Sequence, residues 1–197
     1  MMIYQEKIFT KEECDKILSY REIYTDLPYR VAEDVIDLEN RRIDQFIRLE
    51  NGKKTGKFFN VWDIPNDKET HWFFKKIINW FSNISEIQIK DSNYYPNGCG
   101  LHKYSKGDLF QKHIDLTKNH LDRRWNLGIQ LNEEYTGGEY VCYDSNDNPI
   151  ILSKEVGTAI AYDAKTLHEI KEITSGERYS IVITITTHTL IEKKSMI

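Results

Sequence analysis

The sequence is poor in the residues that build cross-linked, fibrous or low-complexity proteins. It contains only three Cys, four Pro and ten Gly among 197 residues. Cys14, Cys99 and Cys142 are odd in number and widely spaced, with no CxxC pair. Neither a disulfide framework nor a thiolate zinc site is therefore indicated, and a reducing compartment suits the chain best. Collagen-like, disordered and repeat architectures are excluded by the same composition.

The sequence also lacks an excess of one charge and any long apolar run. Its 27 Lys and Arg against 31 Asp and Glu give a net charge of −4. Without a general positive field, nucleic acid and anionic membrane surfaces are not the expected partners. No apolar stretch approaches the roughly 18 residues that a membrane helix requires. We therefore expect a cytoplasmic protein without a membrane partner; the sequence does not indicate its oligomeric state.

What is present is enough chain for one well-packed domain. A chain of this length buries roughly 70% of its unfolded surface, so a core that encloses a pocket is feasible. We expect a single domain over residues 1–197. Within it, residues 1–95 are expected to form a helical support and substrate region, and 96–190 the catalytic core.

Two helices are predicted in the N-terminal half. Thr10 and Glu13 form a capping-box pattern ahead of apolar residues at helical spacing, which predicts a helix over 10–21. A second helix is predicted over 67–82, with Asn66 as a possible cap and an aromatic stripe facing a sheet. Residues 21–60 are polar and mixed, and indicate either a solvated hairpin or a lid that contacts substrate.

After residue 85 the pattern becomes one of short strands separated by turn residues. Strands are predicted near 86–95, 100–105, 108–113, 124–131, 139–143, 149–152, 156–163, 167–173 and 178–188. Helices followed by about eight strands indicate an α+β, mainly β fold. We expect antiparallel strands in a jelly roll, the double-stranded β-helix of cupin-like proteins, flanked by the N-terminal helices.

Three residues could hold a metal ion. His113 and Asp115 are two apart at the end of a predicted strand, a spacing that points both side chains to one face. His168, on a later strand, could complete the two-His, one-carboxylate set of non-haem Fe(II) oxygenases. Taken singly, the His-x-Asp pair is compatible with chance and His168 with an ordinary core histidine. Four further histidines are interpreted as structural or solvated, namely His71, His102, His120 and His188.

Arg178 is the residue that favours the metal interpretation. It shares a strand face with Ser180, and a guanidinium beside a hydroxyl can hold a carboxylate through paired hydrogen bonds. A cation inside a β-sandwich is costly without an anionic partner. We expect that partner to be the distal carboxylate of 2-oxoglutarate.

These residues lie in a pattern that resembles a known family. It consists of Tyr104-x-x-Gly107-x-x-Phe110-x-x-His113-x-Asp115, then Leu131-Asn132, Gly137-Gly138-Glu139, Leu167-His168-Glu169 and Gly176-Glu177-Arg178-Tyr179-Ser180. The segment from Leu101 to His188 resembles the core of the Fe(II)- and 2-oxoglutarate-dependent oxygenases, particularly the prolyl 4-hydroxylase-like branch. The opening Phe9–Cys14 also looks like that branch's first helix.

The resemblance implies roles for particular residues. His113, Asp115 and His168 would bind Fe(II), and Arg178 would bind 2-oxoglutarate with help from Tyr104 and Ser180. Asn126 could form one wall of the cosubstrate pocket. The implied reaction uses O₂ to hydroxylate a C–H bond while 2-oxoglutarate is converted to succinate and CO₂, with ascorbate as a candidate reductant.

The substrate class stays open at this point. The implied substrate is a prolyl or other residue in a protein or peptide. One alternative is a hydroxylase of a free amino acid or small metabolite, which the compact chain would suit. A second is a non-catalytic jelly-roll protein that binds metal. Substrate selection is expected in residues 21–65 and 116–124, where the family pattern is weakest.

Overall fold

In the residues that it describes, the computed structural model has two main antiparallel sheets, with two helices packed on one side. It describes residues 2–24, 30–31, 48–50, 53–55, 60–85, 87–89, 99–116, 122–186 and 191–193. The helices are α1 (Lys11–Ile23) and α4 (His71–Ser85). Neither of these two described helices is both long and apolar enough to cross a membrane.

The larger sheet carries most of the strands. Its strands lie in the order β1 (Ile3–Lys7), β13 (Thr158–Asp163), β9 (Arg123–Gln130), β15 (Ile173–Thr186), β7 (Cys99–Ser105), β5 (Asn60–Ile64) and β2 (Arg30–Val31), with β10 (Tyr135–Gly137) paired to β15. The smaller sheet contains β12 (Pro149–Ile151), β11 (Tyr140–Tyr143), β14 (His168–Ile170) and β8 (Phe110–His113). Two short pairs lie apart, β16 (Ile191–Lys193) with β6 (Ile87–Ile89) and β3 (Arg48–Glu50) with β4 (Lys53–Thr55).

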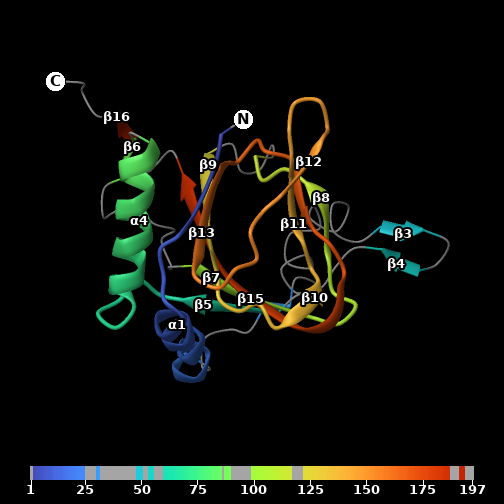
Figure 1. Ribbon diagram of the computed structural model, residues 1–197, viewed down its shortest axis with the longest axis horizontal. Coiled ribbons are helices and arrows are strands. Elements are labelled where there is room, and N and C mark those ends of the chain that lie inside the picture. The colour runs from blue at the N-terminus through green and yellow to red at the C-terminus, as the bar shows by residue number, and fades with distance from the viewer. Residues whose placement is uncertain are drawn as a thin grey trace.

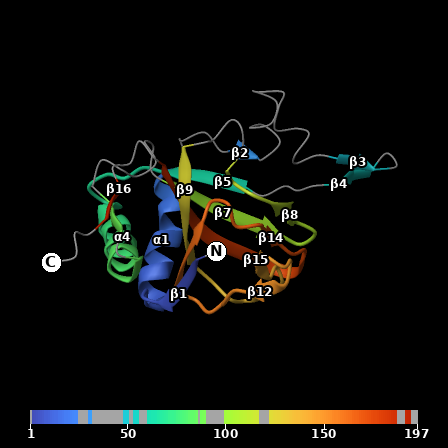
Figure 2. The same cartoon turned by 90° about the horizontal axis from the view of Figure 1, so that it is seen from above.

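The two sheets face each other, and α1 and α4 lie on the far side of the larger one (Figures 1 and 2). Every pair of neighbouring strands in the described residues is antiparallel. The mainly β jelly roll with flanking helices is therefore confirmed.

Strand alternation divides the larger sheet into an apolar outer face and a polar inner face. On β9, Leu127 and Ile129 belong to the apolar cluster that includes both helices, whereas Asn126 and Gln130 are buried polar residues. On β15, Ile181 joins the same cluster, and its neighbour Ser180 lines a pocket between the sheets. Successive side chains of a strand point to opposite faces of the sheet. The outer face of these two strands therefore packs against the helices, while their inner face lines the pocket.

The start of α1 agrees with the sequence prediction, but the start of α4 does not. The capping box of α1 is present: Glu13 N–H donates to Thr10 Oγ1, and Thr10 N–H donates to a Glu13 carboxylate oxygen. Helix α4 begins at His71, later than predicted. The carboxylate of Asp67, and not Asn66, accepts the N–H groups of Glu69 and Thr70 in the turn before it.

Four strands of the larger sheet were not predicted: β1, β2, β5 and β10. Strand β1 lies at the sheet edge with mostly polar, exposed side chains, so it lacks the apolar alternation by which a half-buried strand is found. The predicted break at Ser175–Gly176 is wrong, because β15 continues through it. Gly176 has a φ of +76° within the strand, which glycine accommodates without strain. The chain turns instead between β14 and β15.

Several predictions concern residues outside the described ranges. Of the strand predicted over 86–95, the structure describes β6 alone. His120 and His188 lie outside the described residues, as do most of 21–60 and residues 117–121.

Candidate metal centre

The two candidate histidine ligands lie opposite each other on neighbouring strands. In the smaller sheet β8 pairs with β14, and the register places His113 across from His168. Their ring centroids are 4.2 Å apart. The two histidines are more than fifty residues apart in the sequence, and the pairing of β8 with β14 brings them together. Both imidazoles lie on the inner side of the small sheet.

Backbone carbonyls fix which ring nitrogen of each histidine carries the proton and which carries the lone pair. His113 Nδ1 lies 2.6 Å from Gln111 O, and His168 Nδ1 lies 2.9 Å from Thr166 O. A carbonyl oxygen only accepts, so Nδ1 carries the proton in the neutral ring and Nε2 carries the lone pair. This is the arrangement that orients histidine for a metal ion.

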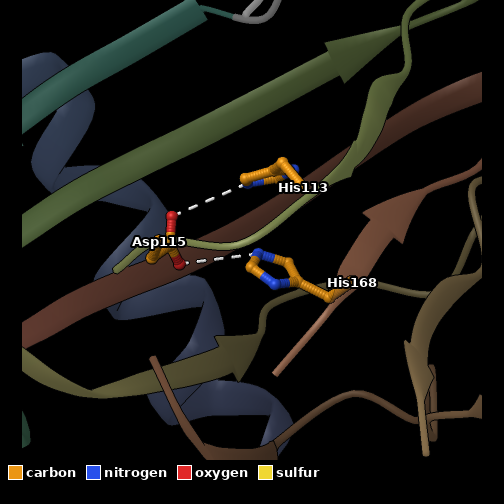
Figure 3. A group of neighbouring side chains, drawn as sticks. All are labelled: His113, Asp115 and His168. Atoms are coloured by element: carbon orange, nitrogen blue, oxygen red, sulfur yellow. Dashed lines mark ion pairs between the residues drawn. The ribbon is translucent and has the colours of Figure 1, made fainter. Parts of the chain in front are cut away.

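Asp115 completes the cluster just beyond the end of β8. Its carboxylate oxygens lie 3.6 Å from His113 Nε2 and 3.5 Å from His168 Nε2. Figure 3 shows the two imidazoles and the carboxylate pointing toward one another. The potential ligand atoms of the three residues lie within 4.8 Å of one another.

The loop of Asp115 is fixed by its backbone and its carboxylate. The N–H groups of Asp115 and Leu116 both donate to Ala164 O, at 3.1 and 3.0 Å. The side-chain amide of Asn126 donates to one carboxylate oxygen, and Arg123 Nη1 lies 3.4 Å from the other. These contacts hold the carboxylate toward the two histidines.

The protonation states of the cluster suit a divalent cation. Burial, reinforced by the neighbouring His168, lowers the pKa of His113 to about 4. Burial opposes ionisation of Asp115, but both imidazoles, Arg123 and the Asn126 amide together lower the pKa of its carboxyl. A neutral imidazole and an ionised carboxylate are the forms that bind metal. The three residues therefore fit an Fe(II) ion of the two-His, one-carboxylate type.

Arg178 lies on the inner face of β15 with 1% of its surface exposed. Its Nη1 donates to Ser180 Oγ at 2.9 Å, and its Nη2 donates to Gln130 Oε1 at 2.5 Å. Its Nε is buried without a hydrogen-bond partner. No carboxylate among the described residues forms an ion pair with it. A buried, permanently charged group with only neutral partners fits an anionic ligand.

Aromatic rings enclose the guanidinium. Its Cζ lies 5.5 Å from the centroid of Tyr104 and 5.7 Å from that of Tyr140, distances at which ring faces stabilise a cation. Tyr104 and Ser180, which the sequence predicts to help Arg178 bind 2-oxoglutarate, thus lie beside it. Asn126 lines the same pocket, but its amide contacts Asp115 and so connects the pocket to the metal cluster.

The pocket lies between two apolar clusters that join the sheets. It is bounded by polar groups that include Asn126, Gln130, Tyr140, Tyr162, Arg178 and Ser180. One cluster contains Tyr104 and Ile170, and the other contains Cys142 and Ile160. Apolar side chains beside the cation lower the local dielectric constant, which strengthens electrostatic interactions there.

Sequence reasoning missed three polar residues of this pocket: Gln130, Tyr140 and Tyr162. The strand alternation that identified Arg178 and Ser180 also applies to β9, where Gln130 shares a face with Asn126. The same rule places Tyr162 on the inner face of β13. Tyr140 lies on β11 of the facing sheet, and no local pattern indicates which strand opposes it.

The comparisons with known proteins agree with this geometry. Residues 99–185 match the description "2OG-Fe(II) oxygenase superfamily". This segment belongs to the 2OG-Fe(II) oxygenase superfamily. It spans β7 to β15 and contains all seven residues predicted for the site.

Curated proteins similar to this chain include hydroxylases. A PKHD-type hydroxylase from Parvibaculum lavamentivorans is 29% identical over 85 residues, 42% of this chain and 38% of the relative. The chain therefore spans well under half the length of this curated relative. The predicted superfamily is confirmed over residues 99–185, and the curated relatives are named hydroxylases.

Two solved structures share the fold over nearly the whole chain. A Pseudomonas putida prolyl-4-hydroxylase has a TM-score of 0.64 at 13% identity, and the alignment covers 93% of this chain and 91% of that protein. A Trichoplax adhaerens prolyl hydroxylase, solved with a hypoxia inducible factor peptide, has a TM-score of 0.65 at 12% identity, with coverages of 95% and 83%.

Proposed function

We propose that this protein is an Fe(II)- and 2-oxoglutarate-dependent dioxygenase that hydroxylates a C–H bond of a prolyl or other residue in a protein or peptide. The observation that carries the proposal is the closeness of two features, which are connected by two residues of the pocket: Asn126 contacts Asp115, and Tyr162 contacts His168. One is the cluster of His113, Asp115 and His168. The other is Arg178, a buried cation without a carboxylate partner among the described residues.

The chain's own residues would divide the work as follows. His113, Asp115 and His168 would hold Fe(II), which when bound activates O₂ for hydroxylation with succinate and CO₂ as coproducts. Arg178 and Ser180 would bind the distal carboxylate of 2-oxoglutarate. Asn126 and Arg123 would orient Asp115.

The peptide substrate is supported by the names of similar proteins. The fold neighbours include prolyl hydroxylases, one of them bound to a peptide, and the sequence relative is named a hydroxylase. A pocket flanked by apolar clusters would shield the reaction from water.

The test of the proposed reaction is formation of succinate. Purified protein with Fe(II), ascorbate and 2-oxoglutarate should form succinate even without substrate, and His113→Ala should abolish this. His71→Ala is the matched control, because His71 lies at the start of α4 and contacts Asn66. Equal succinate formation by the wild type and His113→Ala would refute the assignment, as would retention of zinc with no binding of 2-oxoglutarate.

The substrate requires a separate measurement. Mass spectrometry of prolyl peptides and free amino acids, each incubated with and without 2-oxoglutarate, should show a peptide that gains one oxygen atom. Gain of oxygen on free amino acids only would replace the peptide substrate with a small metabolite.

A further inference from the structure

A chain of two buried phenols ends on a proposed metal ligand. Tyr162 on β13 is 3% exposed, and its hydroxyl lies 3.2 Å from His168 Nε2. The hydroxyl of Tyr140 on β11 is hydrogen-bonded to that of Tyr162. The two rings are at 81° to each other with centroids 5.8 Å apart.

The position of the proton on His168 determines the direction of both hydrogen bonds. His168 Nδ1 donates to Thr166 O, so in the neutral ring Nε2 can only accept. Tyr162 therefore donates its single proton to His168 Nε2. Tyr140 must then donate to the Tyr162 oxygen, because that oxygen has no second proton to give.

The bond from Tyr162 to His168 cannot coexist with a metal ion on the same nitrogen. Nε2 has one lone pair, and coordination uses it. Tyr162 is nonetheless held in place, since β13 pairs with β9 and Tyr162 lies opposite Asn126, whose amide contacts Asp115. A buried hydroxyl that loses its acceptor must find another, at a cost of about 1–3 kcal/mol if it does not.

We propose that, once the metal is bound, Tyr162 donates its hydrogen bond to an oxygen atom of 2-oxoglutarate at the metal, and that Tyr140 positions Tyr162 for this contact. The proposal rests on the proposed function, since it requires Fe(II) and 2-oxoglutarate in this pocket. Tyr140 contacts residues at both ends of the pocket. Its hydroxyl is hydrogen-bonded to Tyr162 near the metal cluster, and its ring lies 5.7 Å from the Arg178 guanidinium. The two tyrosines thereby connect the carboxylate-binding end with the metal end.

The competing acceptor is Asp115, whose carboxylate faces the same space. Its two oxygens already accept from Asn126 and Arg123. If Tyr162 donated to Asp115 instead, removing its hydroxyl would change the affinity for Fe(II), because Asp115 is a proposed metal ligand. If it donates to 2-oxoglutarate, removing the hydroxyl would lower the affinity for 2-oxoglutarate.

The test is Tyr162→Phe, examined without oxygen. Fe(II) affinity should stay within about threefold of wild type, or become tighter, because the phenol no longer competes for His168. The affinity of the Fe(II)-loaded protein for 2-oxoglutarate should fall about tenfold, the loss expected for a hydrogen bond to a charged group. The visible charge-transfer absorption of the chelated keto acid should shift in wavelength.

Tyr143→Phe is the matched control, because Tyr143 is on the same strand as Tyr140 but its hydroxyl contacts Glu169. It should leave both affinities and the absorption unchanged. Tyr140→Phe should change the 2-oxoglutarate affinity in the same direction as Tyr162→Phe, but less. It replaces Tyr162→Phe in the test if thermal unfolding shows that Tyr162→Phe does not fold.

The outcomes separate the two proposals. If wild-type protein with Fe(II) and 2-oxoglutarate shows no charge-transfer absorption, the proposed function fails. If the absorption appears but is the same in the tyrosine variants, with unchanged 2-oxoglutarate affinity, only the role of Tyr162 is overturned. Loss of Fe(II) affinity without a change in 2-oxoglutarate affinity also overturns it, in favour of Asp115 as the acceptor.

Discussion

Arg178 and Gln130 form a buried charged–neutral pair on adjacent strands of the larger sheet. Arg178 Nη2 donates to Gln130 Oε1 at 2.5 Å, while Gln130 Nε2 donates to the hydroxyl of Tyr135 at 3.0 Å. The amide orients the guanidinium without neutralising it. The positive charge is thus left for a ligand, which is why substitutions at these two positions are informative.

Gln130→Glu should convert this pair into an internal ion pair. The carboxylate would compete with the keto acid for Arg178, so 2-oxoglutarate affinity should fall at least tenfold in calorimetry. The ligand-free protein should gain about 1–3 kcal/mol in free energy of unfolding, because the buried cation acquires a partner. Gln130→Met removes the amide without adding charge. Equal affinities for the Glu and Met variants would contradict the competition.

Arg178→Met tests whether the cation serves binding or folding. A charge-assisted contact to a carboxylate contributes about 1.5–3 kcal/mol, so 2-oxoglutarate affinity should fall roughly 10- to 100-fold. The melting temperature without ligand should be unchanged or higher, since a buried unpaired charge is removed. Arg21→Met, on the surface against Tyr179, is the control. A large loss of ligand-free stability would show that Arg178 is structural.

Asp115→Asn should weaken metal binding while keeping the shape of the side chain. The variant removes the only anionic ligand of the cluster and leaves Arg123 without its partner. We expect affinity for Fe(II), or for Co(II) as a spectroscopic probe, to fall at least tenfold. Asp147→Asn, whose carboxylate pairs with Lys112 on the surface, should bind metal as the wild type does. Comparable metal affinities for both variants would exclude Asp115 as a ligand.

The residues of this candidate site could be proposed from the sequence more completely than the strands that carry them. His113, Asp115, His168 and Arg178 could be predicted because their chemistry requires particular residue types, whatever the exact strand boundaries. Strand β1 could not, because an edge strand with exposed polar side chains has no apolar alternation. Tyr140 reaches the pocket from the facing sheet, and only the three-dimensional arrangement of the sheets brings it to Arg178.

The stability of α1 should depend on pH through Glu13. Burial opposes ionisation of this carboxyl, but hydrogen bonds from Lys76 and from the Thr10 backbone lower its pKa below the ordinary value. A carboxyl with a lowered pKa stabilises the fold above its unfolded pKa, about 4.3, and this contribution is lost as the pH falls through the folded pKa. Glu13→Gln should therefore cost about 1 kcal/mol at pH 7 and progressively less at acid pH.

Urea unfolding of the wild type and Glu13→Gln across this pH range measures the difference. Asp15→Asn is the control, because its pair with Lys11 is an exposed i, i+4 contact that contributes about 0.3–0.5 kcal/mol. A Glu13→Gln effect that is the same at acid and neutral pH would show that the carboxylate charge is not what stabilises the helix start.

Gly157 and Gly107 have the same backbone conformation in different surroundings, and alanine at each should have different effects. Both have a φ of +86°. A Cβ at Gly107 would meet nothing within 4 Å, whereas one at Gly157 would lie 2.0 Å from Phe9 O. That segment cannot easily move, because the N–H groups of Ile8 and Phe9 both donate to Gly157 O at 3.1 and 3.0 Å.

Gly107→Ala should therefore cost only the strain of a left-handed alanine, about 1–2 kcal/mol. Gly157→Ala should cost at least about 3 kcal/mol, since it adds a backbone collision where the chain enters α1. Urea unfolding of both variants at one pH measures the two losses. Similar losses would show that the contact between Gly157 and Phe9 adjusts freely, and that it does not fix the N-terminal segment on the sheet.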